Sequence, residues 1–257
     1  MPKLSTLFTA INQRLQSRLV HLAKLLVELF PNVHPNWYTA FRLIYIVPLF
    51  LLLRDEPYVT SSIIIATFVA PIILLVMRRY FVTTLVFLAI LGLELSLIFL
   101  ERYNEAALLL FILGAFLDLV DGPVARYTRQ TSRTGALLDP LADKLMFMTA
   151  LVAFYEEINV YIFWAILILE ALLLVEHLIK FFVFRHESQA KRAEVQKSGI
   201  WGKVKFVLEV AGSIALFLIA YWSPFMYVAN IILLLAFPLA FQSLFQHLLS
   251  YRKRPNS

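Results

Sequence analysis

Long uninterrupted apolar runs are the feature that most constrains what this chain can fold into. A bilayer offers no water to backbone N–H and C=O groups, so a spanning segment must pair them internally, in a helix or a closed barrel. A barrel would alternate apolar and polar residues, whereas residues 63–77 read IIIATFVAPIILLVM. Eight runs are long enough to cross about 30 Å of hydrocarbon. They lie near residues 37–53, 57–77, 80–100, 106–122, 136–155, 158–184, 204–222 and 224–247. The runs predict an all-α, polytopic integral membrane helical bundle with about eight transmembrane helices.

Composition agrees with this prediction. Hydrophobic residues make up 61% of the 257 residues and charged residues 16%, against about 45–50% and about 25% in soluble domains. This excludes an ordinary soluble protein and a disordered chain. The absence of cysteine excludes disulfides, thiolate metal sites and cysteine nucleophiles. The net charge of +6 fits cytoplasmic loops that face anionic lipid better than it fits nucleic-acid binding.

The segment before the first run is amphipathic. From Leu4 to Leu29, leucines and other apolar residues recur at spacings of three and four, and polar residues fill the opposite face. This pattern predicts an N-terminal helix on the membrane surface, the alternative being a soluble helix packed on a partner. It lacks the pattern of a cleaved signal peptide. The predicted domains are an interfacial helix at 1–34, a transmembrane domain at 35–250 and a basic cytoplasmic tail at 251–257.

Lysine and arginine positions predict the orientation of the bundle. With the N-terminus in the cytoplasm, 18 of the 23 basic residues fall in cytoplasmic segments, and only Arg54 and Arg102 fall on the opposite side. The remaining three lie within runs, near their cytoplasmic ends. Positive residues concentrate on the cytoplasmic side of membrane proteins. The count therefore places residues 118–143 at the cytoplasmic face.

Four of the five aspartates lie in that one stretch: Asp118, Asp121, Asp139 and Asp143. Acidic side chains at the edge of the hydrocarbon are costly and are candidates for function. The first two are three residues apart and the last two are four apart, so each pair lies on one helix face. One pair closes the inward-running fourth run and the other opens the fifth, with a short loop between. We therefore expect the four carboxylates to converge.

Converging carboxylates repel one another unless a cation lies among them. Oxygen ligands without histidine or cysteine suit Mg²⁺ or Mn²⁺, and these ions suit a diphosphate substrate because they neutralise its charge. Interleaved glycines and alanines let a ligand approach the backbone, and Arg126 could hold a phosphate. The alternative is an ion-pair network, in which Arg126, Arg129, Arg133 and Lys144 neutralise the acids.

The stretch DLVDGPVARYTRQTSRTGALLDPLAD, residues 118–143, resembles the signature of the CDP-alcohol phosphotransferase family. That signature reads D-x-x-D-G-x-x-A-R, eight residues, then G-x-x-x-D-x-x-x-D, and every fixed position is met. Members move a phosphatidyl group from a CDP-linked lipid onto an alcohol and release CMP. The resemblance covers residues 35–50 and 106–250 and implies a CDP-diacylglycerol substrate, Mg²⁺ or Mn²⁺ as cofactor, a lipid bilayer environment and a homodimer.

The resemblance also implies roles for single residues. Asp118, Asp121 and Asp139 would hold one metal ion, and Asp139 and Asp143 would contact a second. Asp143 would be the general base that deprotonates the acceptor hydroxyl. The implied CDP-binding residues within the signature are Gly122, Ala125, Arg126, Ser132 and Gly135.

Further stretches are similar to the branch of the family that makes phosphatidylglycerol phosphate. Residues 35–48, PNWYTAFRLIYIVP, match that branch's opening P-N-x-x-T-x-x-R. Residues 138–144, LDPLADK, and 201–205, WGKVK, are also similar to sequences usual in that branch. Asn36 and Thr39 would then lie on the nucleotide side, and glycerol 3-phosphate would be the acceptor. The candidate acceptor-binding residues are Arg42, Lys144, Lys180, Arg185, Lys203 and Lys205.

Two departures leave alternatives open. The family usually has six spans, so residues 57–100 would be an inserted helix pair, in which Glu94 is unexplained. The sixth run lacks the Arg-Glu pair usual in that branch, although Glu170 and Glu176 lie within it and favour a function. Inositol phosphate is therefore an alternative acceptor, as is phosphatidylglycerol, the acceptor of a cardiolipin synthase of this family.

A membrane transporter or scaffold is the alternative of a different class, but transporters place ionisable groups near the midplane. A bacterial inner membrane is the expected location.

Overall fold

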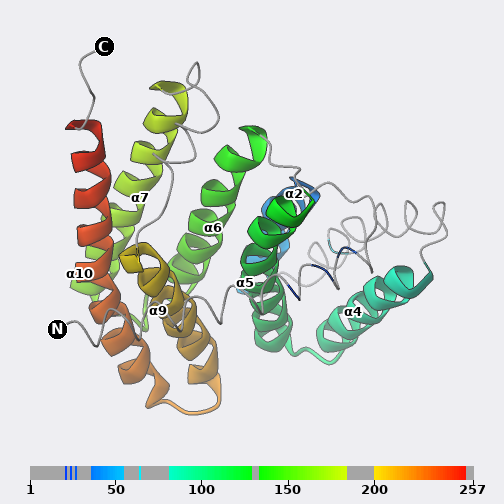
Figure 1. Cartoon of the computed structure of the whole chain (residues 1–257). Helices are drawn as coiled ribbons and strands as arrows, with labels where there is room; N and C mark the ends of the chain where they lie inside the picture. Colours follow the sequence, from blue (N-terminus) through cyan, green and yellow to red (C-terminus); the bar gives the residue numbers. More distant parts are fainter. Residues whose placement is uncertain are drawn as a thin grey trace. The chain divides into compact units, whose positions relative to one another are not determined.

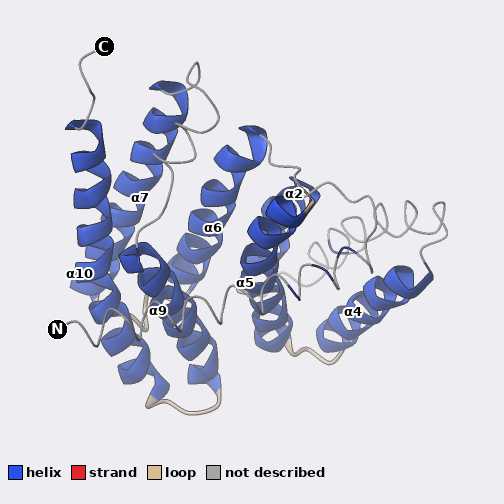
Figure 2. Ribbon diagram, in the orientation of Figure 1, coloured by secondary structure: helices blue, strands red, loops and turns tan. Residues whose placement is uncertain are grey.

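The computed structural model describes residues 36–54, 81–128, 133–183 and 200–252, together with His21, Lys24, Val27 and Ile64. Within these residues the regular structure is entirely helical, as the apolar runs predict (Figures 1 and 2). The helices are α2 (Asn36–Leu52), α4 (Phe81–Phe99), α5 (Tyr103–Tyr127), α6 (Arg133–Ala153), α7 (Val160–Val183), α9 (Ile200–Phe217), the short 3-10 helix η1 (Leu218–Ala220) and α10 (Phe225–Arg252).

In the part of the chain that the structure describes, three helices are long and apolar enough to cross a membrane: Tyr103–Ala125, Val160–Val183 and Phe225–Gln246. Arg42–Leu52 and Leu88–Phe99 are shorter apolar helices. These findings support an integral membrane protein. The predicted span at 57–77 and nearly all of the predicted N-terminal amphipathic helix lie outside the described residues, so the count of eight spans and that surface helix stay predictions.

The surface of α7 shows how this chain differs from a soluble protein. Glu170, Glu176 and Lys180 lie on its buried face. Its exposed face is apolar and carries Trp164, Ile168, Leu172, Val175, Ile179 and Phe182 at spacings of three and four. Soluble proteins rarely bury charged side chains on one face while exposing large apolar ones on the other. In lipid the arrangement is favourable, because the apolar face meets hydrocarbon and the charges find partners inside the protein.

The chain divides into two compact units, Met1–Asp139 and Pro140–Ser257. In the first unit α5 packs against both α2 and α4. Its buried positions include Ala106 and Ala107, whose small side chains let a neighbouring helix approach closely. On α2, Tyr45, Leu49 and Leu52 are buried. This packing fixes the face of α2 that carries Thr39 and Arg42.

In the second unit α9 and α10 form a hairpin around η1 and pack closely along their length. A Cβ atom added at Gly212 would lie 2.9 Å from Leu233 Cδ2, so glycine permits this close approach. Asn230 of α10 joins the hairpin to the turn between α6 and α7. Its Oδ1 accepts a hydrogen bond from the backbone N–H of Asn159, and its Nδ2 donates to the carbonyl of Glu157. The buried core of this unit includes Leu151, Phe163, Ile166, Leu216 and Leu233.

Candidate functional site

The signature aspartates lie in two consecutive helices. Asp118 and Asp121 lie in the second half of α5, Asp139 lies in the first half of α6, and Asp143 lies at the middle of α6. α5 continues to Tyr127, five residues beyond the apolar run, because backbone hydrogen bonding within a helix does not depend on hydropathy. The first half of the signature thus lies within one helix, although this part of α5 contains Pro123.

Arg42 of α2 forms an ion pair with Asp118 of α5. Its Nη1 lies 2.5 Å from Asp118 Oδ1, across 76 residues of sequence. The Arg42 side chain is fully buried and that of Asp118 is 21% exposed. A guanidinium group inside the protein requires an anionic partner, and Asp118 supplies it. The observed contact of Arg42 is thus with a signature aspartate, while its predicted contact with a phosphate stays a prediction.

Thr39 of α2 contacts another signature aspartate, Asp139. Its hydroxyl donates a hydrogen bond of 2.5 Å to Asp139 Oδ1, and the Thr39 side chain is buried. Thr39 and Arg42 are three residues apart, so they lie on one face of α2. Asp118 and Asp139 are consequently held beside the same turn of α2. We call Thr39, Arg42, Asp118 and Asp139 the α2 aspartate cluster.

The donor chemistry of the α2 aspartate cluster fits a hard divalent cation. Two carboxylates face one guanidinium, so the cluster has an excess of negative charge. Each observed hydrogen bond uses an Oδ1 atom, and the Oδ2 atoms are not engaged in these two bonds. Among the side chains that the structure describes, no three acidic or histidine groups already form a metal cage. The side chain of Asp121, the third predicted ligand, lies outside the described set.

Asp143 lies one helical turn after Asp139 in α6, at the start of the second unit. It is close enough to Glu209 of α9 for the two charges to interact. The next residue, Lys144, connects α6 to a second group of charges. Its Nζ lies 3.0 Å from Glu170 Oε2 of α7.

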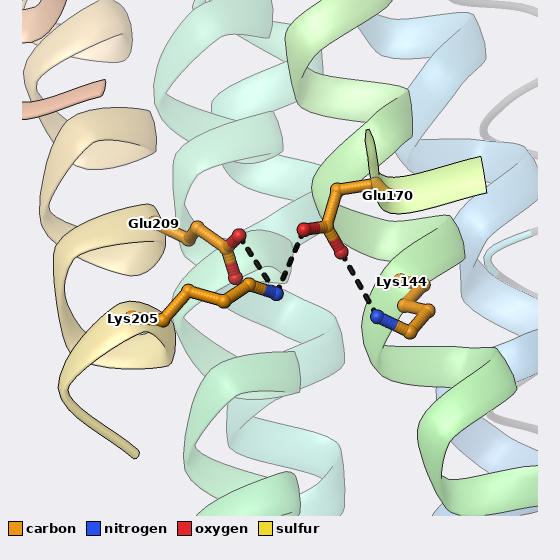
Figure 3. Close-up of polar contacts among 4 residues, drawn as sticks. All are labelled: Lys144, Glu170, Lys205 and Glu209. Atoms are coloured by element: carbon orange, nitrogen blue, oxygen red, sulfur yellow. Dashed lines mark hydrogen bonds and ion pairs between the residues drawn. The ribbon is translucent and has the colours of Figure 1, made fainter. Parts of the chain in front are cut away.

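That second group joins three helices (Figure 3). Glu170 Oε1 lies 2.8 Å from Lys205 Nζ of α9, and Lys205 Nζ lies 2.9 Å from Glu209 Oε1 on the same helix. Glu170 thus binds one lysine with each oxygen, and Lys205 is shared between two carboxylates. We call Lys144, Glu170, Lys205 and Glu209 the lysine–glutamate network.

The lysine–glutamate network is buried and electrically balanced. Glu170 is 1% exposed, Glu209 5%, Lys205 8% and Lys144 11%. Two positive charges meet two negative ones, so the desolvation cost of each charge is offset by a partner at hydrogen-bond distance. Lys180 is paired in the same way with Glu176, at 2.9 Å and one turn away on α7.

The other predicted site residues are placed less completely. Ala125 lies in α5 and Gly135 is buried in α6. Asn36 lies in α2, Lys203 lies in α9, and Gly122 and Arg126 lie in α5. For these four residues the structure describes the helix but not the surroundings. Ser132 and Arg185 fall outside the described residues altogether. The roles predicted for these residues stay predictions.

Glu209 is the one member of either cluster that the sequence reasoning missed. A signal was available, because Lys205 and Glu209 are four residues apart in an otherwise apolar helix. That spacing brings a lysine and a glutamate together on one helix face. Glu170 was singled out by its position in an apolar run, and Lys144 and Lys205 as candidates for the acceptor, but the pairing of these lysines with Glu170 was not predicted.

Comparison with known proteins identifies the family of the chain. Residues 68–242 match the family model of CDP-alcohol phosphatidyltransferases. A protein of Sodalis glossinidius named CDP-diacylglycerol--glycerol-3-phosphate 3-phosphatidyltransferase is 35% identical over 147 residues, which cover 56% of this chain and 77% of the relative. The protein of that name from Yersinia enterocolitica is 34% identical over 143 residues, covering 54% and 75%.

A third relative of that name, from Blochmanniella floridana, is 42% identical over 71 residues, covering 28% of this chain and 36% of the relative. No solved structure is significantly similar to the chain. The family model covers well over half of the sequence and includes the whole aspartate signature. The chain therefore belongs to the CDP-alcohol phosphatidyltransferase family.

Proposed function

We propose that this protein transfers a phosphatidyl group from CDP-diacylglycerol to glycerol 3-phosphate, giving phosphatidylglycerol phosphate and CMP. The observation that carries the proposal is the complete aspartate signature, two of whose carboxylates are held by one face of α2. The names of the relatives support the acceptor. A transporter or scaffold would leave both the signature and this likeness unexplained.

We propose Asp118, Asp121 and Asp139 as ligands of one divalent ion, and Asp139 and Asp143 as contacts of a second. Mg²⁺ or Mn²⁺, when bound there, would neutralise the charge of the diphosphate and of the departing phosphate. The excess of negative charge in the α2 aspartate cluster supports this assignment, because carboxylate oxygens without nitrogen or sulfur ligands prefer hard cations.

Asp143 is proposed as the general base. It would accept the proton of an acceptor hydroxyl while that oxygen forms a bond to the phosphatidyl phosphorus. The bond between this phosphorus and the oxygen of CMP breaks, and CMP leaves with both electrons of that bond. A carboxylate suits this task because it is deprotonated near neutral pH unless its surroundings oppose the charge.

The nucleotide is proposed to bind beside the same two helix segments. Asn36 lies at the start of α2, one turn before Thr39, and Gly122, Ala125 and Arg126 follow Asp121 in α5. Ser132 and Gly135 complete the set. Glycine and alanine at these positions would let the backbone approach the ligand, and Arg126 would pair with a phosphate.

The acceptor contacts are proposed in two classes. Lys144, Lys180 and Lys205 already pair with buried glutamates, so their charges are balanced before any acceptor arrives. Arg185 and Lys203 form the second class and are proposed as contacts of the acceptor phosphate. The same balance favours a second candidate acceptor that carries less negative charge, such as phosphatidylglycerol. Inositol phosphate is the third acceptor to test.

The proposed setting is a bacterial inner membrane with the site at the cytoplasmic face and the protein as a homodimer. The excess of basic residues in the predicted cytoplasmic segments supports the orientation. The bacterial relatives support the location.

The test is CMP release from CDP-diacylglycerol by the detergent-purified protein with Mg²⁺ or Mn²⁺. Glycerol 3-phosphate, inositol phosphate and phosphatidylglycerol are offered separately, with Asp143→Asn as the inactive control. Release with glycerol 3-phosphate alone is the expected result. Release with another acceptor alone would replace the acceptor and keep the reaction, whereas no release with any of them would reject the proposed function.

A further inference from the structure

The contacts that α2 makes are not explained by nucleotide binding. Thr39 and Arg42 were expected to face the nucleotide and a phosphate, yet their observed hydrogen bonds go to Asp139 and Asp118. Both aspartates belong to the signature, and each is separated from its partner on α2 by at least 76 residues. A contact at this sequence distance depends on how the helices pack, so it is a property of the site and not of local chain geometry.

We propose that Thr39 and Arg42 set the cation affinity of the aspartate site, Thr39 by orienting Asp139 and Arg42 by holding a positive charge against Asp118. This inference rests on the proposed function only in assuming that the signature aspartates bind a divalent ion. Neither residue is assigned as a metal ligand or as a catalytic residue. Both act through an aspartate and are therefore positioning residues.

The two residues act with opposite sign. The Thr39 hydroxyl is neutral, and its hydrogen bond fixes the Asp139 carboxylate in one orientation, which favours a ligand that needs that orientation. Removing hydrogen-bonding partners of metal ligands typically lowers metal affinity by about 10- to 100-fold. Arg42 is a cation beside a carboxylate, so its charge opposes the arrival of a second cation at Asp118.

Burial strengthens both effects. Arg42 is fully buried and Thr39 is 1% exposed, so water screens neither the hydrogen bond nor the charge. Without a metal ion, Arg42 stabilises Asp118, which would otherwise be a largely buried carboxylate with a second carboxylate nearby. Arg42 thus keeps the ion-free site folded at the expense of cation affinity.

The experiment measures binding of Mn²⁺ alone to the purified full chain, without substrate, by electron paramagnetic resonance of the free ion. Thr39→Val removes the hydroxyl at almost constant shape and is expected to weaken Mn²⁺ binding about tenfold. Thr39→Ser keeps the hydroxyl and is expected to bind like the wild type. Thr84→Val, at another buried threonine of the first unit in α4, is the matched control and is expected to change nothing.

The Arg42 variants test the opposite sign. Arg42→Gln removes the charge and is expected to tighten Mn²⁺ binding about tenfold, because the repulsion between two cations is lost. Its thermal unfolding without metal is expected at a lower temperature than that of the wild type, with a larger rise on adding Mn²⁺. Arg42→Lys keeps the charge and is expected to bind within about threefold of the wild type.

Equal affinity of Thr39→Val and the wild type would overturn the role of Thr39, and weaker binding by Arg42→Gln would overturn that of Arg42. If Arg42→Gln does not fold, the Thr39 pair and Arg42→Lys still decide. Absence of Mn²⁺ binding by the wild type would reject the metal ions of the proposed function, a result distinct from unchanged binding by the variants.

Discussion

The α2 aspartate cluster and the lysine–glutamate network are both groups of four polar residues buried in apolar helices, but their charges differ. The cluster sets two carboxylates against one guanidinium, whereas the network sets two carboxylates against two ammonium groups. A group with excess negative charge has capacity for a cation. A balanced group has its charges satisfied and joins α6, α7 and α9. We therefore propose the cluster as the place where a cation binds and the network as a support for the packing of the helices.

Removing divalent metal should have the largest effect of all, on CMP release, and it tests the cluster's capacity for a cation. With excess EDTA, CMP release is expected to fall to background, because the excess negative charge of the aspartates would be left uncompensated beside a diphosphate. Adding Mg²⁺ or Mn²⁺ back should restore it. The assay is CMP release at constant CDP-diacylglycerol. Undiminished release in EDTA would show that the cluster does not need a cation.

Asp143→Asn should lower CMP release by about 1,000-fold, within the range for loss of a general base. The amide keeps the size of the side chain and cannot accept the proton. Glu105→Gln is the control, since Glu105 forms a partly exposed ion pair with Arg102 in the turn before α5. Asp143→Asn with wild-type turnover would remove Asp143 from the chemistry and leave the network as the better candidate.

Glu170→Gln should have the largest effect on folding. It removes a carboxylate that binds both Lys144 and Lys205, leaving the two ammonium groups of the network with one remaining network carboxylate. Breaking a buried ion pair in this way costs about 3–5 kcal/mol. The measurement is the free energy of unfolding in detergent.

Replacing all four network residues by leucine or methionine sharpens this prediction. Apolar residues of similar volume often replace a buried ion pair without loss of stability, so the fourfold variant should be more stable than Glu170→Gln. If the fourfold variant is less stable than Glu170→Gln, the charged groups stabilise the fold by more than neutralising one another.

Glu209→Gln should have a smaller effect, about 1 kcal/mol, since Lys205 keeps Glu170 as a partner at 2.8 Å and the amide oxygen can still accept a hydrogen bond. The same unfolding measurement applies. A loss as large as that of Glu170→Gln would mean that the two carboxylates share Lys205 equally.

Arg102→Gln should have the smallest effect. The Arg102 side chain is 52% exposed and pairs with Glu105 within one helical turn, and exposed pairs contribute about 0.2–1 kcal/mol. We expect the change in unfolding free energy to stay below about 0.5 kcal/mol. A larger loss would show that exposure does not separate the weak pairs of this protein from the strong ones.

Several features of this protein could be predicted from sequence because they depend on neighbours along the chain. The apolar runs predicted seven of the described helices, and most helix ends lie within a few residues of the predicted ones. These helices are α2, α4, α5, α6, α7, α9 and α10. The larger differences are at the ends of α5, α9 and α10. α5 and α10 continue beyond their apolar runs to Tyr127 and Arg252, whereas α9 ends at Phe217, within its run, and is followed by η1. The spacing of the aspartates placed each pair on one helix face.

Other features depended on which helix faces meet. The sequence contains Thr39, Arg42, Asp118 and Asp139, but nothing in it pairs Arg42 with an aspartate instead of a phosphate. Lys144 and Lys205 were candidates for the acceptor, and the structure gives each a glutamate partner on α7. A lysine in an apolar helix must find an anion, but the sequence does not say which one.

Hydropathy, helical periodicity and motif spacing are properties of contiguous segments, so the sequence by itself determined the membrane-spanning class, the aspartate signature and the family. The pairing of charges between different helices was decided only by the tertiary structure. Ion pairs such as Arg42–Asp118, across 76 residues, form when packing brings two helix faces together and removes water from both groups. That desolvation makes each charge require a partner, and no local pattern specifies a partner on another helix.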